Sequence, residues 1–506
     1  MTARERFRPG FFKGLEVAIV GMGKSNQALT RYLLREGAEV TCFDQKEPSD
    51  LGPAYGEFSA LGVRWSLGGD YLAPLPGFKW IFLTPGMKKN LPEIALAREN
   101  GAVISSEIGL FLDRVKCPVF AVTGSSGKTT TCTLAGLMLR EGLPGREIYV
   151  GGNIGSVLIE QVDSIPEDAV VVMELSSFQL ELLDKSPCVS AVLNIRPNHL
   201  DIHETFEDYV EAKKNIFRFQ DPGGWCFLNL DDGVAAGLAE SCPGGTGFFT
   251  LDAAKAGRLL TEAGDLPLAW ASGEGLYVSP GRLLGKGLSG EWRGRTPVQV
   301  AKREDFLVPG NHNVSNALAA ALLAAAAGAS PRGIRKAIQG FKGVEHRIEF
   351  VRELGGVSYY NDSIATSPDR TEALLDAIGG PLVIILGGYD KGLPFDSLAR
   401  KIAARGCGVV TIGKAAPVIE EALARAEGES LERAGAGNTG EGSGAKPKMQ
   451  VVRASSLDEA VTLATDMARR IPGSSVVLSP ACASYDMFRN FEERGRAFKE
   501  AVRRLG

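Results

Sequence analysis

The segment AVTGSSGKTT, Ala121 to Thr130, combines residue types that bind nucleotide phosphates. Its glycines let backbone N–H groups turn toward phosphate oxygens, and a helix that starts there points its positive end at them. Lys128 has the reach to contact the terminal phosphates, and the Thr129 hydroxyl is a ligand for Mg²⁺. The full GxxxxGK[ST] pattern requires glycine where Val122 stands, so the sequence predicts a shorter phosphate loop. Its phosphate-binding residues would be Gly124, Ser125, Ser126, Gly127, Lys128, Thr129 and Thr130.

Two polar residues follow apolar strands and are expected near this loop. Glu174 comes directly after Ala169 to Met173, and His199 follows the apolar run 189–193. The carboxyl ends of parallel strands meet at one sheet edge, where such side chains hold a cation. Taken alone, each is equally consistent with a helix cap or a surface residue. An HxxxH spacing links His199 to His203, but the chain has no HExxH pattern and no nearby cysteine, which argues against zinc.

A second glycine-containing turn, GMGKSN at 21–26, follows the first strand-forming run. Asp44 closes the next strand, as an acidic residue does in dinucleotide-binding folds. The third glycine of that fingerprint is replaced by Asn26, so the pattern favours some nucleotide or phosphate-bearing ligand without specifying NAD. A tight turn that binds nothing is the alternative.

These motifs lie on alternating strand and helix patterns that predict three α/β domains in series. The expected fold is a Rossmann-like domain at 1–108, a central phosphate-loop ATPase domain with a parallel sheet at 109–343, and a Rossmann-like domain at 344–506. Short strands broken by glycine predict an insertion between 250 and 308, before a long alanine-rich helix at 311–328. The glycine-rich stretch 427–448 has Leu431 as its one large apolar residue and predicts a disordered surface loop.

Composition limits the possible partners and location. The formal net charge of −4 gives no general attraction to nucleic acid or to anionic membranes. The longest apolar run, 317–327, is too short to span a bilayer, and no apolar core of a signal peptide follows the first arginines. We therefore expect a cytoplasmic protein that binds neither nucleic acid nor membrane. The eight cysteines form no CxxC pair and are expected to be reduced core residues.

The chain as a whole resembles the Mur ligase family. The resemblance rests on TGSSGKTT, GGNIG, ELSSFQL, NHLD, GNHNVSN, EHR, NDSIATSP, GGYDKG and SPACASYDMFRNFEERG, in this order, and on Tyr209 followed by Ala212 and Lys213. It implies that ATP converts a carboxylate into an acyl phosphate, which an amine then attacks. The last two motifs and the first domain are most similar to the members that add D-glutamate to UDP-N-acetylmuramoyl-L-alanine in peptidoglycan precursor synthesis. No enzyme nucleophile is needed, and the sequence offers no convincing one.

The resemblance also implies a role for each matching residue. Lys128 would contact the terminal phosphates, Thr129 and Glu174 would bind one Mg²⁺, and His199 and a carbamylated Lys213 would bind a second. The adjacent Lys214 does not match the family position. The remaining implied contacts are Asn316, Arg347 and Asp362 for ATP, Asp44 and Thr84 for the UDP part, Asn153 and Ser176 for the muramoyl-alanine end, and Thr366, Lys391, Ser484 and Phe491 for D-glutamate.

One departure from the family pattern concerns the incoming amino acid. Many relatives carry lysine where Ile364 stands, so one positive charge is either missing or supplied elsewhere. Alternatives remain open: a sister ligase for L-alanine or a diamino acid, a folylpolyglutamate synthase, or a non-catalytic sensor of a UDP-sugar or nucleotide. The first domain argues against the second of these, and the absence of a DNPR-like segment argues against a diamino-acid ligase. We expect a monomer.

Overall fold

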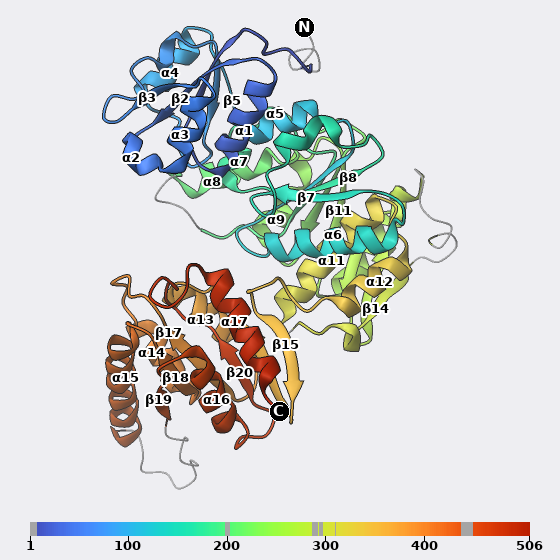
Figure 1. Ribbon diagram of the computed structural model, residues 1–506. Coiled ribbons are helices and arrows are strands. Elements are labelled where there is room, and N and C mark those ends of the chain that lie inside the picture. Colours follow the sequence, from blue (N-terminus) through green and yellow to red (C-terminus); the bar gives the residue numbers. More distant parts are fainter. Residues whose placement is uncertain (1–7, 198–202, 286–291, 293–296, 309, 437–448) are drawn as a thin grey trace. The chain divides into compact units, whose positions relative to one another are not determined.

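The computed structural model describes residues 8–197, 203–285, 292, 297–308, 310–436 and 449–506 (Figure 1). The described strands form three sheets. The chain divides into two compact units, one made of Met1–Asp305 with Asn311–Gln339 and the other of Phe306–Gly310 with Gly340–Gly506. The first unit holds two of the sheets and the second unit holds the third, as the alternating sequence pattern predicts.

The first sheet is parallel and has the order β3-β2-β1-β4-β5. Its strands are β1 (Glu16–Val20), β2 (Glu39–Asp44), β3 (Arg64–Leu67), β4 (Trp80–Leu83) and β5 (Val103–Ser105). Its helices are α1 (Lys24–Arg35), α2 (Pro48–Leu51), α3 (Pro53–Ala60) and α4 (Pro92–Glu99). From β1 the chain adds β2 and β3 on one side and then β4 and β5 on the other. Open α/β sheets bind ligands at the carboxyl ends of the strands where the direction changes in this way, which here is the end of β1.

The central sheet has the order β14-β13-β12-β11-β10-β9-β6-β8-β7. Its strands are β6 (Val119–Thr123), β7 (Ile148–Gly152), β8 (Val170–Glu174), β9 (Val189–Val192), β10 (Trp225–Asn229), β11 (Gly245–Thr250), β12 (Leu268–Ala271), β13 (Gly275–Ser279) and β14 (Val298–Lys302). Only β13 runs antiparallel to its neighbours, so the segment predicted as an insertion extends the sheet. The neighbouring helices are α5 (Glu107–Arg114), α6 (Lys128–Gly142), α7 (Ser177–Leu180), α8 (Phe206–Lys214), α9 (Gly233–Gly237), α10 (Ala253–Ala263), α11 (Asn311–Ala326) and α12 (Pro331–Gly340).

The third sheet has the order β15-β16-β20-β17-β18-β19, parallel except for the hairpin of its first two strands. Its strands are β15 (Glu349–Leu354), β16 (Val357–Asn361), β17 (Leu382–Gly387), β18 (Gly408–Ile412), β19 (Val451–Arg453) and β20 (Ser475–Leu478). Its helices are α13 (Pro368–Ala377), α14 (Asp396–Arg405), α15 (Ala416–Ala436), α16 (Leu457–Ala468) and α17 (Phe491–Arg504).

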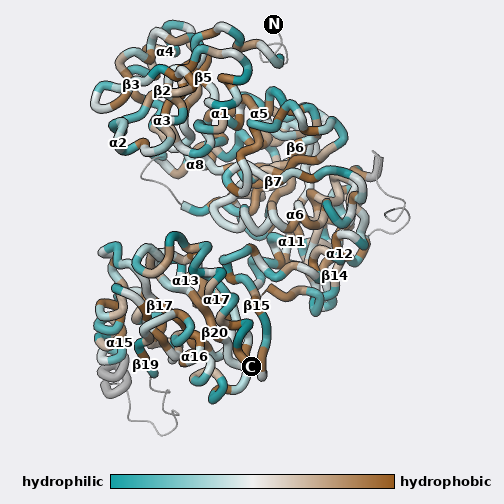
Figure 2. Tube along the Cα trace, in the orientation of Figure 1, coloured by the Kyte–Doolittle hydropathy of each residue, from teal (hydrophilic) through white to brown (hydrophobic). Residues whose placement is uncertain are grey.

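The core of each unit lies along its strands, which Figure 2 shows as predominantly hydrophobic segments. Strands β6 and β17 are buried at every residue, because helices cover both faces of a parallel sheet. The apolar run at 317–327 belongs largely to α11, whose small alanine side chains allow close packing against α6 (Figure 1). Within the described residues, no helix is both long enough and apolar enough to cross a bilayer.

Three expectations from the sequence are corrected by the structure. The stretch predicted as a disordered loop is helical up to residue 436, as part of α15, and its residues 437–448 lie outside the described residues. Helix α10 was not expected between the glycine-broken strands. The cysteines are free, but Cys188 is exposed and Cys242 half-buried, so these two are not core residues.

Candidate active site

The predicted phosphate loop connects β6 to α6. Gly127 precedes the first residue of α6 and has a φ of +83°, which glycine adopts without strain. A Cβ atom there would lie 2.3 Å from Oδ1 of Asn316 in α11. Nζ of Lys128 donates a hydrogen bond of 2.8 Å to the carbonyl oxygen of Gly124, across the loop. The glycine is therefore required both by the backbone turn and by the close approach of α11.

Asn194, just beyond β9, supports the loop from the neighbouring strand. Its side-chain oxygen accepts a 2.9 Å hydrogen bond from the N–H of Ser126, and its side-chain nitrogen donates to the carbonyl oxygen of the same residue at 3.2 Å. Its own carbonyl oxygen accepts from the N–H of Ser125 at 2.9 Å. Sequence reasoning missed Asn194. The available signal was its position at the carboxyl end of the strand beside β6.

Glu174 is the last residue of β8 and is 2% exposed. Its Oε2 accepts a 2.8 Å hydrogen bond from the Thr129 hydroxyl, and its Oε1 accepts one of 2.9 Å from Nδ2 of Asn153. Gly152 makes this approach possible, because a Cβ atom at that position would lie 2.3 Å from the Glu174 carbonyl oxygen. The structure thus brings together the Thr129 hydroxyl and the Glu174 carboxylate, which the family resemblance assigned to one Mg²⁺, and adds the Asn153 amide beside them.

Lys213 points from α8 into the protein beneath the phosphate loop. It is 1% exposed, and its Nζ lies 3.2 Å from the Gly124 carbonyl oxygen and 3.3 Å from Oγ1 of Thr123. The ring of Tyr209 lies against it, with the centroid 4.5 Å from Nζ. Burial, together with the positive charge of Lys128, lowers the pKa of Lys213 well below the ordinary lysine value. This shift favours the unprotonated amine more than at an exposed lysine.

The neighbouring Lys214 has a different environment, since its Nζ pairs with Glu211 at 2.6 Å on the surface. Two adjacent lysines on a helix ordinarily both lie on a solvated face. Here Lys213 is buried and Lys214 is partly exposed. The structure also places Tyr209 so that its hydroxyl lies 3.0 Å from Oγ of Ser125, a loop residue.

The donors around Glu174 fit a hard cation. Hydroxyl and carboxylate oxygens are the ligands that Mg²⁺ prefers, and both converge at Thr129 and Glu174. In the part of the chain that the structure describes, no group of three histidine, cysteine, aspartate or glutamate side chains forms a metal cluster. His199 lies outside the described residues. His203 is described, and its ring stacks on Phe178 with centroids 5.1 Å apart.

Asp44 and Thr84 converge on the first glycine-containing turn. Oδ2 of Asp44 accepts a 2.8 Å hydrogen bond from the N–H of Met22. Gly21 has a φ of +83°, and a Cβ atom there would lie 2.8 Å from Cγ2 of Thr84. Nδ2 of Asn26 donates to the carbonyl oxygens of Val20 and Gly21 at 2.9 and 2.8 Å. Asn26, which replaces the third glycine, therefore stabilises the turn by hydrogen bonds from its own side chain.

Ser176 has a structural role in addition to any contact with substrate. Its hydroxyl accepts a 3.3 Å hydrogen bond from the N–H of Gln179, while Oε1 of Gln179 accepts a 3.0 Å bond from the N–H of Ser176. This reciprocal capping box begins α7 directly after Glu174 and Leu175.

In the second unit, Asp362 lies at the carboxyl end of β16 and is 4% exposed. It accepts hydrogen bonds from Oγ of Ser479 at 2.9 Å and from the N–H of Ile348 at 3.2 Å. Burial raises the pKa of Asp362 to about 7, although those two bonds and the charges of Arg347 and Arg370 favour the ionised form. The predicted nucleotide contacts Arg347 and Asp362 are therefore electrostatic neighbours.

The four residues predicted to contact D-glutamate lie on connected loops of the same unit. Nζ of Lys391 donates a 3.1 Å hydrogen bond to the carbonyl oxygen of Thr366. Tyr389 bridges to Ala483, next to the buried Ser484. Oγ of Ser363 donates a 2.8 Å bond to the carbonyl oxygen of Phe491. Buried Arg494 links these loops. Its Nε donates to Oγ of Ser363 at 3.0 Å, its Nη2 to the carbonyl oxygen of Ser363 at 2.9 Å and its Nη1 to the carbonyl oxygen of Ala483 at 3.2 Å.

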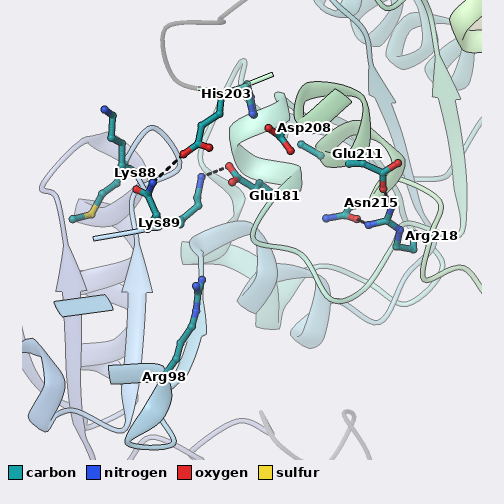
Figure 3. A pocket seen from close by; sticks show the side chains of 13 residues that line it. Lys88, Lys89, Arg98, Glu181, His203, Asp208, Glu211, Asn215 and Arg218 are labelled. Carbon is teal, nitrogen blue, oxygen red and sulfur yellow. Dashed lines mark hydrogen bonds and ion pairs between the residues drawn. The ribbon is translucent and has the colours of Figure 1, made fainter. Parts of the chain in front are cut away.

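A cavity of about 590 Å³ lies between the segment after β4 and helix α8 (Figure 3). Lys88, Lys89 and Arg98 line it on one side, and the acidic side chains Glu181, Asp208 and Glu211 lie on the other (Figure 3). Lys89 pairs with Glu181, and Arg218 pairs with Glu211. None of the site residues predicted from sequence lines this cavity. The Lys89–Glu181 pair and a 3.1 Å hydrogen bond from Nδ2 of Asn90 to Glu204 connect the segment after β4 to the residues around α7 and α8.

Three family models match the chain: Mur ligase MurD-like, N-terminal domain at residues 15–106, Mur ligase middle domain at 122–257 and Mur ligase, glutamate ligase domain at 346–482. These ranges lie within the domains predicted at 1–108, 109–343 and 344–506, whose boundaries stay predictions. Among solved structures, UDP-N-acetylmuramate-alanine ligase from Thermotoga maritima has a similar fold, with a TM-score of 0.51, 18% identity and coverage of 97% of this chain and 99% of that one.

Full-length relatives are much closer in sequence. UDP-N-acetylmuramoylalanine--D-glutamate ligase of Symbiobacterium thermophilum is 46% identical over 96% of this chain and 98% of its own length. The enzyme of the same name from Acetivibrio thermocellus is 40% identical over 97% of this chain and 96% of its own length. Because these matches run through all three sheets and include the phosphate loop, the chain belongs to the Mur ligase family.

Proposed function

We propose that this protein is an ATP-dependent ligase that joins D-glutamate to UDP-N-acetylmuramoyl-L-alanine, a step of cytoplasmic peptidoglycan precursor synthesis. The observation that carries the proposal is the near-full-length identity to relatives named for this reaction. The geometry at the loop supports it, because Lys128 and Thr129 lie beside a buried carboxylate at the carboxyl edge of a parallel sheet.

The reaction proceeds in two steps. An oxygen of the substrate carboxylate attacks the γ-phosphorus of ATP, and ADP leaves. The amine of D-glutamate, having lost a proton, attacks the acyl carbon, and inorganic phosphate departs through a tetrahedral intermediate. Catalysis is then mainly positioning and neutralisation of charge, which the loop N–H groups, Lys128 and the start of α6 supply.

Mg²⁺ would be held by Thr129 and Glu174, and a second ion by His199 and carbamylated Lys213. Bound there, the ions would neutralise negative charge on the phosphates and the developing acyl phosphate. Carbamylation is supported by the lowered pKa of Lys213, because only an unprotonated amine adds CO₂ and releases a proton. The product carries anionic oxygens where an ammonium group would repel the metal.

The other substrate groups are assigned to the remaining clusters. Asp44 and Thr84 flank the first turn and would hold the UDP part, while Asn153 and Ser176 would contact the muramoyl-alanine end. Asn316, Arg347 and Asp362 would bind ATP. Thr366, Lys391, Ser484 and Phe491 would bind D-glutamate. We further propose a monomer, which sedimentation of the purified protein tests directly.

The experiment that tests the function is release of phosphate from ATP in the presence of UDP-N-acetylmuramoyl-L-alanine and one amino acid at a time. D-glutamate is expected to support release of ADP and phosphate, whereas L-alanine, L-lysine and meso-diaminopimelate are not. Formation of AMP would exclude the acyl-phosphate route. Preference for another amino acid would place the protein with a sister ligase.

A further inference from the structure

Arg370 and Lys391 donate hydrogen bonds to the same short loop from different elements of the second unit. Nη1 of Arg370, in the first turn of α13, lies 3.1 Å from the carbonyl oxygen of Ile364. Nζ of Lys391, beyond β17, lies 3.1 Å from the carbonyl oxygen of Thr366. The acceptor residues are two positions apart and so lie within about 7 Å of each other. Two cations therefore flank this loop at the carboxyl edge of the third sheet.

The charge of Arg370 acts on the nearby buried Asp362, but no carboxylate bonds directly to either cation among the described residues. Both side chains belong to exposed residues, and among the described residues neither forms an ion pair with a carboxylate. Arg370 also occupies the first turn of α13, where the helix dipole favours negative rather than positive charge. A cation at this place does not help the helix, and its guanidinium retains N–H groups beyond the one bonded to Ile364.

We propose that Arg370 and Lys391 form a two-cation clamp for a dicarboxylate amino acid, with each cation pairing with one of its two carboxylates. This inference rests on the proposed function and adds Arg370 to the residues of the amino-acid site. The two carboxyl carbons of an extended glutamate are about 5 Å apart, which is comparable to the span between the two flanked carbonyls. Arginine is also suited to bidentate pairing with a carboxylate.

The clamp gives a physical account of Ile364. The loop lacks the lysine that the family pattern places at that position, but the carbonyl of Ile364 holds the Arg370 guanidinium instead. The positive charge is then supplied from α13 rather than from the loop. A site with two cations also selects glutamate over amino acids that have one carboxylate, because a neutral side chain leaves one cation without its partner.

The test measures D-glutamate kinetics of the Arg370→Ala and Arg370→Lys variants by phosphate release. Arg370→Ala is expected to raise the KM for D-glutamate about tenfold, as loss of one charge-assisted hydrogen bond does, and to change the KM for ATP much less, since Arg370 acts on Asp362 only through its charge. Arg370→Lys should recover most of the loss because it keeps the charge. The thermal midpoint of Arg370→Ala should equal or exceed that of the wild type, since a cation is removed from the start of α13.

The two mono-amides of D-glutamate, D-glutamine and D-isoglutamine, identify which carboxylate each cation holds. Each is measured as a competitive inhibitor. The mono-amide that lacks the carboxylate held by Arg370 should have the same inhibition constant with Arg370→Ala as with wild type. The mono-amide that lacks the carboxylate held by Lys391 should have the same inhibition constant with Lys391→Ala as with wild type. Arg425→Ala is the control, because that exposed arginine pairs with Asp396 on α14. An unchanged KM for D-glutamate in Arg370→Ala, with active wild-type protein, overturns the clamp. Wild-type protein inactive with D-glutamate overturns the proposed function itself.

Discussion

The Thr129 hydroxyl donates a 2.8 Å hydrogen bond to Oε2 of Glu174, which joins the first turn of α6 to the end of β8. The other oxygen of the same carboxylate accepts a bond from Asn153 at the end of β7. One buried acid therefore connects three segments, because β7 and β8 are adjacent in the sheet and α6 begins beside them. Its geometry places a hydroxyl oxygen and a carboxylate oxygen side by side without a second acidic residue.

Thr129→Val should raise the Mg²⁺ concentration needed for half-maximal activity severalfold, because valine keeps the shape but removes the hydroxyl oxygen. Thr129→Ser keeps that oxygen and should remain close to wild type. The measurement is phosphate release across a magnesium titration at saturating ATP. Equal magnesium requirements in the two variants would contradict a metal-binding role for this hydroxyl.

Lys128→Ala should reduce turnover by about two orders of magnitude or more, because no other side chain of the loop neutralises the transferring phosphoryl group. Lys116→Ala is a matched control, since this lysine is on the surface and pairs with Glu167 at 3.2 Å. Single-turnover kinetics would separate loss of chemistry from loss of ATP binding. Near-normal turnover of Lys128→Ala would make the loop structural.

If Lys213 is carbamylated, activity should fall in CO₂-depleted buffer and return on addition of bicarbonate, because carbamate formation is reversible and the lowered pKa of Lys213 favours the amine that reacts with CO₂. Protein equilibrated with ¹³C-bicarbonate should show one carbamate carbon signal that is absent from Lys213→Ala and retained in Lys214→Ala. Short carboxylates should partly restore the activity of Lys213→Ala. A fully active enzyme whose Lys213 carries no carbamate would refute the assignment.

Gly127→Ala should abolish most activity and lower thermal stability, because its methyl group would meet Oδ1 of Asn316 at 2.3 Å and the backbone φ is +83°. Gly257→Ala in α10 is the matched control. A Cβ atom there meets nothing within 4 Å, and alanine favours a helix. Thermal melts with and without ATP separate a folding defect from a binding defect, and a wild-type ATP shift in Gly127→Ala would contradict the prediction.

Glu107→Gln should remove part of the pH dependence of stability. Burial raises the pKa of Glu107 from 4.5 to about 8, so the folded protein retains a proton that the unfolded chain has released. The free energy of unfolding therefore falls as the pH rises from about 4.5 to about 8, by up to about 1.4 kcal/mol per pH unit. Denaturant unfolding at several pH values should show a shallower decline in Glu107→Gln but not in the exposed-site variant Glu99→Gln.

The sequence by itself indicated the alternation of strands and helices, the phosphate loop and the family. Each of these depends on short-range patterns: apolar runs form buried strands, and glycines with Lys128 and Thr129 follow one of them directly. The helix that continues to residue 436 was missed for a local reason. Once Ile419, Leu423 and Ala426 have packed the helix against the sheet, adding good helix formers such as Glu427 and Leu431 requires little further ordering.

Only the tertiary structure decided which charged and polar side chains are withdrawn from water. Lys213 and Lys214 are adjacent in the chain, but they leave α8 about 100° apart, so Lys213 lies under the loop and Lys214 is partly exposed at the surface. Asn194 and Arg370 likewise acquire their contacts from segments that are close only after folding. Burial shifts the pKa of a side chain, and the approach of distant backbone decides which of its hydrogen-bonding groups have partners. Both depend on segments that are far apart in the sequence, so a local residue pattern does not encode them.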